Sequence, residues 1–184
     1  MNLAHIAMVV SNPCDPDPRV EKEALALVSA GHKVTIHALD REETRPKEEL
    51  LNGVRILRHR VGIIPRGAPN LITGARVLRG LQNFRKAVVK TLETEDVDVV
   101  HCHDADTLWV GLRIKKKSGA KVVFDMHDLA HTWARMTNPA SIIRRIAASG
   151  IERRLVRRLK ACDLVITSSG SVSKTSKPGF REWI

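Results

Sequence analysis

The chain has 184 residues, which is the size of one ordinary domain with its own core, and its 43% hydrophobic content excludes an intrinsically disordered protein. No stretch approaches the roughly 20 apolar residues that cross a bilayer, so any membrane contact must be peripheral. The net charge of +11 favours an anionic partner, such as a nucleotide, a phosphorylated lipid, a membrane surface or a nucleic acid. Only 3% of the residues are aromatic, which argues against nucleic acid as the partner because single strands are usually bound by aromatic stacking.

Strand-length apolar runs alternate with helical patterns from the start of the chain. The run at 3–10 predicts a buried strand, apolar spacing in 19–31 predicts a helix, and 33–39 predicts a second strand. Residues 40–49 are rich in charge and predict a solvated loop. The alternation of apolar and basic residues in 53–61 is typical of an edge strand or a half-exposed strand.

The alternation continues after a loop marked by proline and glycine. The pattern predicts a helix at 71–92, a strand at 97–102, a helix at 106–119, a strand at 121–126, a basic helix at about 140–160 and a strand at 163–168. Strict alternation predicts an α/β fold over residues 1–169, Rossmann-like and doubly wound, with a mainly parallel sheet and helices on both faces. Residues 170–184 show no period and predict an irregular tail.

Polar residues follow four of the predicted strands. They are residues 12–19, 103–106, 127–131 and 168–171. Because ligands bind beyond the carboxyl ends of parallel strands, these four loops are expected to converge on one functional edge.

The stretch VHCHDAD combines two histidines with two aspartates. His101 and His103 are two apart on a strand and so face the same side, and Asp104 or Asp106 is well placed to cap the next helix. A metal would need His103, Asp106 and His127 to converge from separate loops, and no metal-ligand spacing of a known kind is present, so we predict no metal. A strand end with capping aspartates and a substrate-binding role for His103 or Asp106 both remain open.

Familiar nucleotide and nucleophile motifs are absent from the sequence. There is no GxGxxG, no GxxxxGK[ST] and no GxSxG, which counts against a dinucleotide dehydrogenase, a P-loop enzyme, a stand-alone nucleotide-binding enzyme and a serine hydrolase. The three cysteines are scattered and predict reduced thiols in a cytoplasmic protein. Arg19 starts a helix, where it could bind an anion or pair with nearby acids.

A basic face is predicted on the helix near the end of the chain. Its cations include Arg153, Arg154, Arg157 and Arg158. Such a face could contact anionic lipid headgroups at the inner face of a membrane, or it could be the solvated side of an ordinary packed helix.

Four segments in order, 17–36, 97–112, 121–129 and 151–169, resemble the N-terminal domain of family-four, or group 1, glycosyltransferases. The resemblance implies one half of a GT-B fold, in which this domain binds the acceptor. A C-terminal domain would bind the nucleotide-sugar donor, and the sugar would be transferred with retention of configuration, usually without a metal.

The resemblance also implies roles for particular residues. His127 matches the histidine that lies near the transferred sugar and is the candidate catalytic residue. The candidate contacts to the acceptor or the sugar are Asp17, Arg19, His103, Asp104, Asp106 and Asp128, the last of which stands where many relatives have glutamate.

The donor domain has no counterpart in residues 1–184. We therefore expect no cofactor on this domain, a glycan or lipid-linked sugar as acceptor, a donor domain supplied in cis or in trans, and no activity from this domain alone. The alternative is a non-enzymatic, basic, Rossmann-like module that binds a polyanion or a partner protein.

Overall fold

The computed structural model describes residues 3–63, 71–126, 150 and 153–167. The strands are β1 (His5–Val10), β2 (Lys33–Leu39), β3 (Glu48–Leu51), β4 (Val54–His59), β5 (Val99–His103), β6 (Lys121–Met126) and β7 (Leu164–Thr167). The labelled helices are α1 (Pro18–Ser29), α2 (Leu71–Leu92) and α3 (Leu108–Ser118), and residues 153–159 are also helical.

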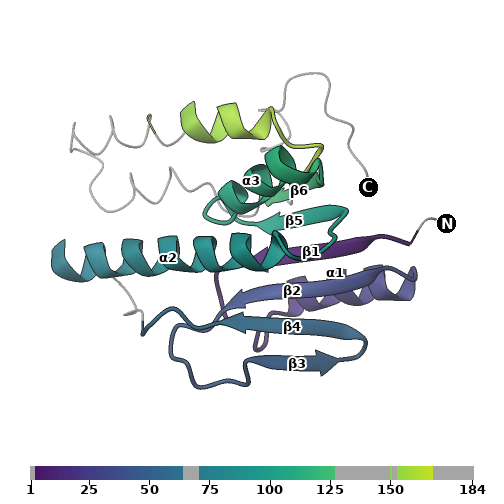
Figure 1. Cartoon of the computed structure of the whole chain (residues 1–184), viewed down its shortest axis with the longest axis horizontal. Coiled ribbons are helices and arrows are strands. Elements are labelled where there is room, and N and C mark those ends of the chain that lie inside the picture. The colour runs from purple at the N-terminus through teal and green to yellow at the C-terminus, as the bar shows by residue number, and fades with distance from the viewer. Residues whose placement is uncertain (1–2, 64–70, 127–149, 151–152, 168–184) are drawn as a thin grey trace.

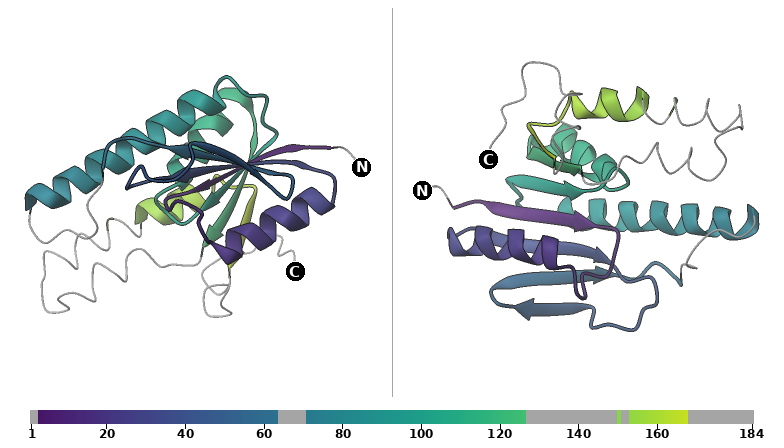
Figure 2. Two further views of the ribbon diagram at one scale, coloured as in Figure 1. Left: turned by 90° about the horizontal axis from the view of Figure 1, so that it is seen from below. Right: turned by 180° about the vertical axis from the view of Figure 1, so that it is seen from behind.

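The strands form one sheet in the order β3-β4-β2-β1-β5-β6-β7 (Figure 1). Every neighbouring pair is parallel except β3 and β4, which are antiparallel. Helix α1 lies on one face of the sheet, and α2 and α3 lie on the other (Figure 2). This is the predicted Rossmann-like, doubly wound α/β fold.

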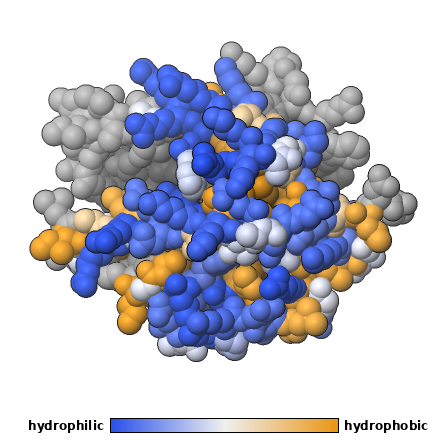
Figure 3. Space-filling model, viewed as in Figure 1, coloured by the Kyte–Doolittle hydropathy of each residue, from blue (hydrophilic) through white to orange (hydrophobic). Residues whose placement is uncertain are grey.

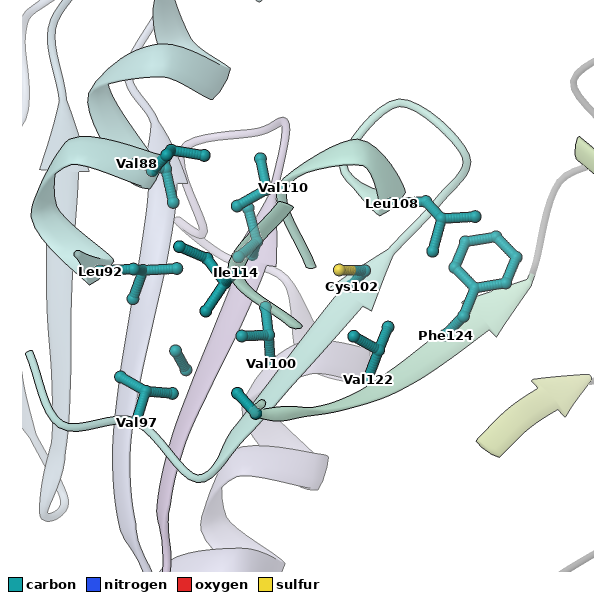
Figure 4. Close-up of a cluster of buried hydrophobic side chains, with 14 of the residues drawn as sticks. Val88, Leu92, Val97, Val100, Cys102, Leu108, Val110, Ile114, Val122 and Phe124 are labelled. Atoms are coloured by element: carbon teal, nitrogen blue, oxygen red, sulfur yellow. The ribbon is translucent and has the colours of Figure 1, made fainter. Parts of the chain in front are cut away.

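Each face of the sheet buries its own apolar core, because successive strand side chains point to opposite faces. Met8 and Ile36 belong to the core under α1, whereas Val100 and Cys102 belong to the core under α2 and α3. Figure 4 shows Cys102 among apolar side chains that come from α3 and the neighbouring strands. Leu155, from the helical residues 153–159, is buried in this second core.

Two predictions about the first half of the chain hold only in part. Residues 41–47 form the predicted loop and are exposed or partly exposed, but β3 begins at Glu48 and the Asp40 side chain is completely buried. The Asp40 carboxylate accepts hydrogen bonds from the backbone N–H groups of Glu42, Glu43 and Arg45, which explains how a charged side chain is accommodated inside.

β4 is not an edge strand, but its alternation of buried and partly buried residues fits the half-exposed strand that the pattern predicts, with Arg58 as the exception. β3 is the edge strand, and β4 lies between β3 and β2. Arg58 is only 6% exposed, because its guanidinium donates hydrogen bonds to the carbonyl oxygens of Pro13 and Cys14 and to the carboxylate of Glu49. Arg58 is therefore a buried anchor for the loop after β1.

Hydrophilic side chains cover much of the face shown in Figure 3, with apolar groups scattered between them and toward the margins. Exposed apolar side chains include Ile63, Ile72 and Leu78. None of the helices in the described ranges is long and apolar enough to cross a membrane.

Candidate functional site

The chain changes direction across the sheet between β1 and β5. β1 is followed through α1 by β2 on one side, and β5 lies on the other side of β1 (Figure 1). In open α/β sheets, ligands bind in the crevice outside the carboxyl ends of strands at such a switch point. The predicted contacts Asp17, Asp104 and Asp106 lie in the loops after β1 and β5, with Arg19 at the start of α1 and His103 at the end of β5.

Asp17 is the N-cap residue of α1. Its carboxylate accepts hydrogen bonds from the backbone N–H of Val20, at 3.3 Å, and from the side-chain amide of Asn12, at 2.7 Å. Its own backbone N–H donates to the carboxylate of Glu21, at 3.0 Å. Pro18 at the first helical position suits this start. Asp17 thus fixes the beginning of the helix that carries Arg19.

Arg19 joins the two loops at the switch point. Its guanidinium lies 4.0 Å from the Asp17 carboxylate and 3.7 Å from that of Asp104. The Arg19 and Asp104 side chains are 30% and 33% exposed, so both reach solvent. The ion pair with Asp17 is one of the two roles predicted for Arg19, and the binding of an anion by Arg19 stays a prediction.

Asp104 turns the chain sharply at the end of β5. Its φ of 67° lies in the left-handed region, which aspartate tolerates better than most residues, and its backbone N–H donates to the carbonyl oxygen of Asp125 on β6. This turn aims the Asp104 carboxylate toward α1, where it pairs with Arg19.

The prediction that Asp104 or Asp106 caps the next helix is wrong. The N-cap of α3 is Thr107, whose hydroxyl donates to the carbonyl oxygens of His103 and Asp104 at 2.7 and 3.1 Å. The carbonyl oxygen of Asp106 accepts a hydrogen bond from Arg85 on α2, at 2.6 Å. Burial lowers the pKa of Arg85 from its ordinary value, with Arg158 adding to the effect and the Asp106 charge opposing it.

His103 is completely buried on the α1 face of the sheet and not open to solvent. Its Nδ1 lies 3.3 Å from the Asp125 carboxylate, and its Nε2 lies 3.9 Å from the carboxylate of Glu23 on α1. The Nε2 atom of His101 lies 3.8 Å from the same Glu23 oxygen. We name Glu23, His101, His103 and Asp125 the histidine–carboxylate cluster. A contact between His103 and an acceptor stays a prediction.

Sequence reasoning missed two members of the histidine–carboxylate cluster. The sequence pattern predicted a helix at 19–31 and a strand at 121–126, but it singled out neither Glu23 nor Asp125. The available signal was Asp125, a carboxylate inside the apolar run VVFDM, which is buried completely.

His127 and Asp128 lie outside the described residues, as do the predicted loops at 127–131 and 168–171. Of the predicted basic face, Arg153, Arg154 and Arg157 are exposed and Arg158 is partly buried.

Burial raises the pKa of all three cysteine thiols, Cys14, Cys102 and Cys162, to about 12. A thiolate is the reactive form of cysteine, and very little of it exists at neutral pH when the pKa is that high. The cysteines are therefore unsuited to nucleophilic catalysis.

The family model described as Glycosyltransferase Family 4 matches residues 19–180, which is most of the chain. No curated protein matches the chain significantly.

Solved structures share the fold of this chain at low sequence identity. Sucrose-phosphate synthase from Thermosynechococcus elongatus has a TM-score of 0.70 and 17% identity, covering 93% of this chain and 44% of the synthase. A shorter chain of the same synthase has a TM-score of 0.65 and 16% identity, covering 97% of this chain and 83% of its own length.

A more distant match is Arabidopsis thaliana UGT89C1 complexed with UDP-L-rhamnose, with a TM-score of 0.53, 11% identity, and coverage of 91% of this chain and 42% of the other. The chain thus spans less than half the length of the full synthase and of UGT89C1. Together these matches show that it has the fold of one half of a GT-B protein.

Proposed function

Because the chain belongs to Glycosyltransferase Family 4, we propose that it forms the acceptor-binding half of a retaining glycosyltransferase. The match over residues 19–180 is the observation that carries this proposal. The donor would be a nucleotide-sugar, bound by a second domain from a longer chain or a partner, and this half alone would be inactive. Coverage of 44% of the full synthase supports the need for a second domain. The family match disfavours a non-enzymatic binding module.

The switch point suits a hydroxyl-rich acceptor such as a glycan. Arg19 provides donors and Asp104 provides acceptors, and both are partly exposed at the edge where the loops after β1 and β5 meet. Sugar transfer depends on holding the acceptor hydroxyl against the sugar carbon, so a rigid polar wall contributes by positioning. His127 directly follows β6, the neighbour of β5, and we propose it as the contact to the transferred sugar.

Substitutions in the whole protein test these roles. Arg19→Ala should raise the acceptor KM about tenfold, a loss of one good charged contact, with a smaller effect on kcat. His127→Ala should lower kcat at least tenfold. Lys22→Ala removes an exposed cation from the same helix and is the matched control. Turnover that is unchanged in His127→Ala, or an acceptor KM that is unchanged in Arg19→Ala, would remove that residue from the site.

A lipid-linked acceptor would bring the protein to an anionic membrane surface. The exposed cations Arg153, Arg154 and Arg157 and the net charge of +11 support peripheral binding there. Replacing these three arginines and Arg158 by glutamate should abolish sedimentation with vesicles that contain phosphatidylglycerol. Sedimentation that survives the replacement would exclude this basic face as the membrane contact.

A further inference from the structure

The histidine–carboxylate cluster brings metal-ligand atoms together from three elements. Glu23 comes from α1, His101 and His103 from β5, and Asp125 from β6. One ligand atom from each of the four side chains lies within 4.8 Å of all the others. His103 and Asp125 are completely buried and His101 is 5% exposed, whereas the Glu23 side chain is 32% exposed, so the cluster lies just inside the protein surface.

The hydrogen bond of His103 determines which nitrogen can bind a metal. A carboxylate only accepts hydrogen bonds, so the contact of 3.3 Å between Nδ1 and Asp125 places the proton of the neutral imidazole on Nδ1. Nε2 then carries a lone pair. Among the described residues this buried atom has no hydrogen-bond partner, and it lies 3.9 Å from Glu23. A carboxylate that orients a histidine through its second nitrogen is the usual support of a metal-binding histidine.

We propose that the histidine–carboxylate cluster binds one divalent transition-metal ion of the zinc class. Nε2 of His101, Nε2 of His103 and the Glu23 carboxylate are the direct ligands, and Asp125 orients His103. Two imidazoles and a carboxylate suit such ions. Zinc held at about 2.1 Å by tetrahedral ligands separates them by about 3.4 Å. The distances of 3.8 and 3.9 Å to Glu23 reach that value after small side-chain rotations.

The metal would tie α1 to the centre of the sheet. Glu23 lies one helical turn after Arg19, so fixing Glu23 to β5 also fixes the helix that holds Arg19 against Asp104. The ion is therefore a structural support for the edge of the sheet. This proposal does not depend on the reaction that the protein performs, and its test measures binding and stability.

Titration of the EDTA-treated protein with Zn²⁺ and Co²⁺ tests the proposal. We expect one equivalent to bind with micromolar affinity or better, the Co²⁺ form to show the visible absorption of a low-coordinate site, and Zn²⁺ to raise the Tm. Glu23→Gln and Asp125→Asn should each weaken binding by tenfold or more. His32→Gln, which removes a partly exposed histidine outside the cluster, should bind as the unaltered protein does.

The result that overturns the proposal is equally direct. Failure of the unaltered protein to bind one equivalent of either ion excludes the site, whatever the variants do. Affinity that is the same in Glu23→Gln, Asp125→Asn and His32→Gln places the binding elsewhere. Circular dichroism in EDTA verifies that each variant is folded. If a variant is misfolded, the titration of the unaltered protein alone decides whether the site exists.

Discussion

Lowering the pH from 7 to 4.5 should reduce the free energy of unfolding by about 5 kcal/mol through His37 and His59 alone. His37 is completely buried, its Nδ1 lies 3.1 Å from Nε2 of His59, and the two rings stack with centroids 5.4 Å apart. Burial lowers the pKa of His37 to about 3, helped by the nearby His59, Arg55 and His5, and lowers that of His59 to about 4.

The direction of the effect follows from where each state takes up protons. The unfolded chain protonates these histidines as the pH falls through about 6.5, whereas the folded protein keeps them neutral down to about 4 for His59 and about 3 for His37. Stability is therefore complete above pH 6.5 and falls by about 1.4 kcal/mol per histidine for each pH unit below it. A typical domain has only about 5–15 kcal/mol to lose.

Urea unfolding between pH 7 and pH 4.5 measures this loss, with the double variant His37→Gln/His59→Gln as the reference. Carboxylates contribute to acid sensitivity in both proteins, so the difference between the two slopes isolates the histidines. The variant should be the less sensitive of the two. Equal slopes would show that His37 and His59 titrate normally in the folded protein.

Gly111→Ala should lower the free energy of unfolding by about 2 kcal/mol. Gly111 lies on α3 where the helix packs against β5 and β6, and a Cβ there would sit 2.6 Å from Sγ of Cys102 and 3.2 Å from a methyl carbon of Val122. Cys102 is completely buried, so its sulfur has little room to move. Overpacking typically costs 1–3 kcal/mol, and it is expected to exceed the gain of about 1 kcal/mol in helix propensity.

Cys102→Ala removes the sulfur atom with which the new Cβ of Gly111→Ala would clash. In a double-mutant cycle measured by thermal unfolding, the double variant should be at least 1 kcal/mol more stable than the sum of the two single effects. Additive effects would mean that the helix shifts freely on the sheet and that close contact at Gly111 is unimportant.

Apolar periodicity predicted the framework well because it depends on neighbours along the chain. The bounds of 33–39, 71–92 and 121–126 match β2, α2 and β6. The burial of Asp40 and Arg58 was not predicted, because local pattern does not show the groups that compensate it. Asp40 accepts hydrogen bonds from backbone N–H groups in a turn, and Arg58 donates to the carbonyl oxygens of distant Pro13 and Cys14.

The candidate site was likewise predicted only in part from the sequence. The convergence of loops at the carboxyl ends of the strands and the pairing of Arg19 with nearby acids were predicted, whereas the strand order and the partner Asp104 were not. The histidine–carboxylate cluster did not follow, because α1 and β6 meet β5 only in the folded protein. Ligand spacing along the sequence therefore could not test for a metal there.

Calorimetric titration of this chain with UDP, GDP and their sugar conjugates tests the central claim most directly. An acceptor-side half should show no detectable binding of any of these compounds, because the proposal places the donor site on a second domain. Micromolar binding of a nucleotide or a nucleotide-sugar would place the donor site on this domain and contradict the proposed division of roles.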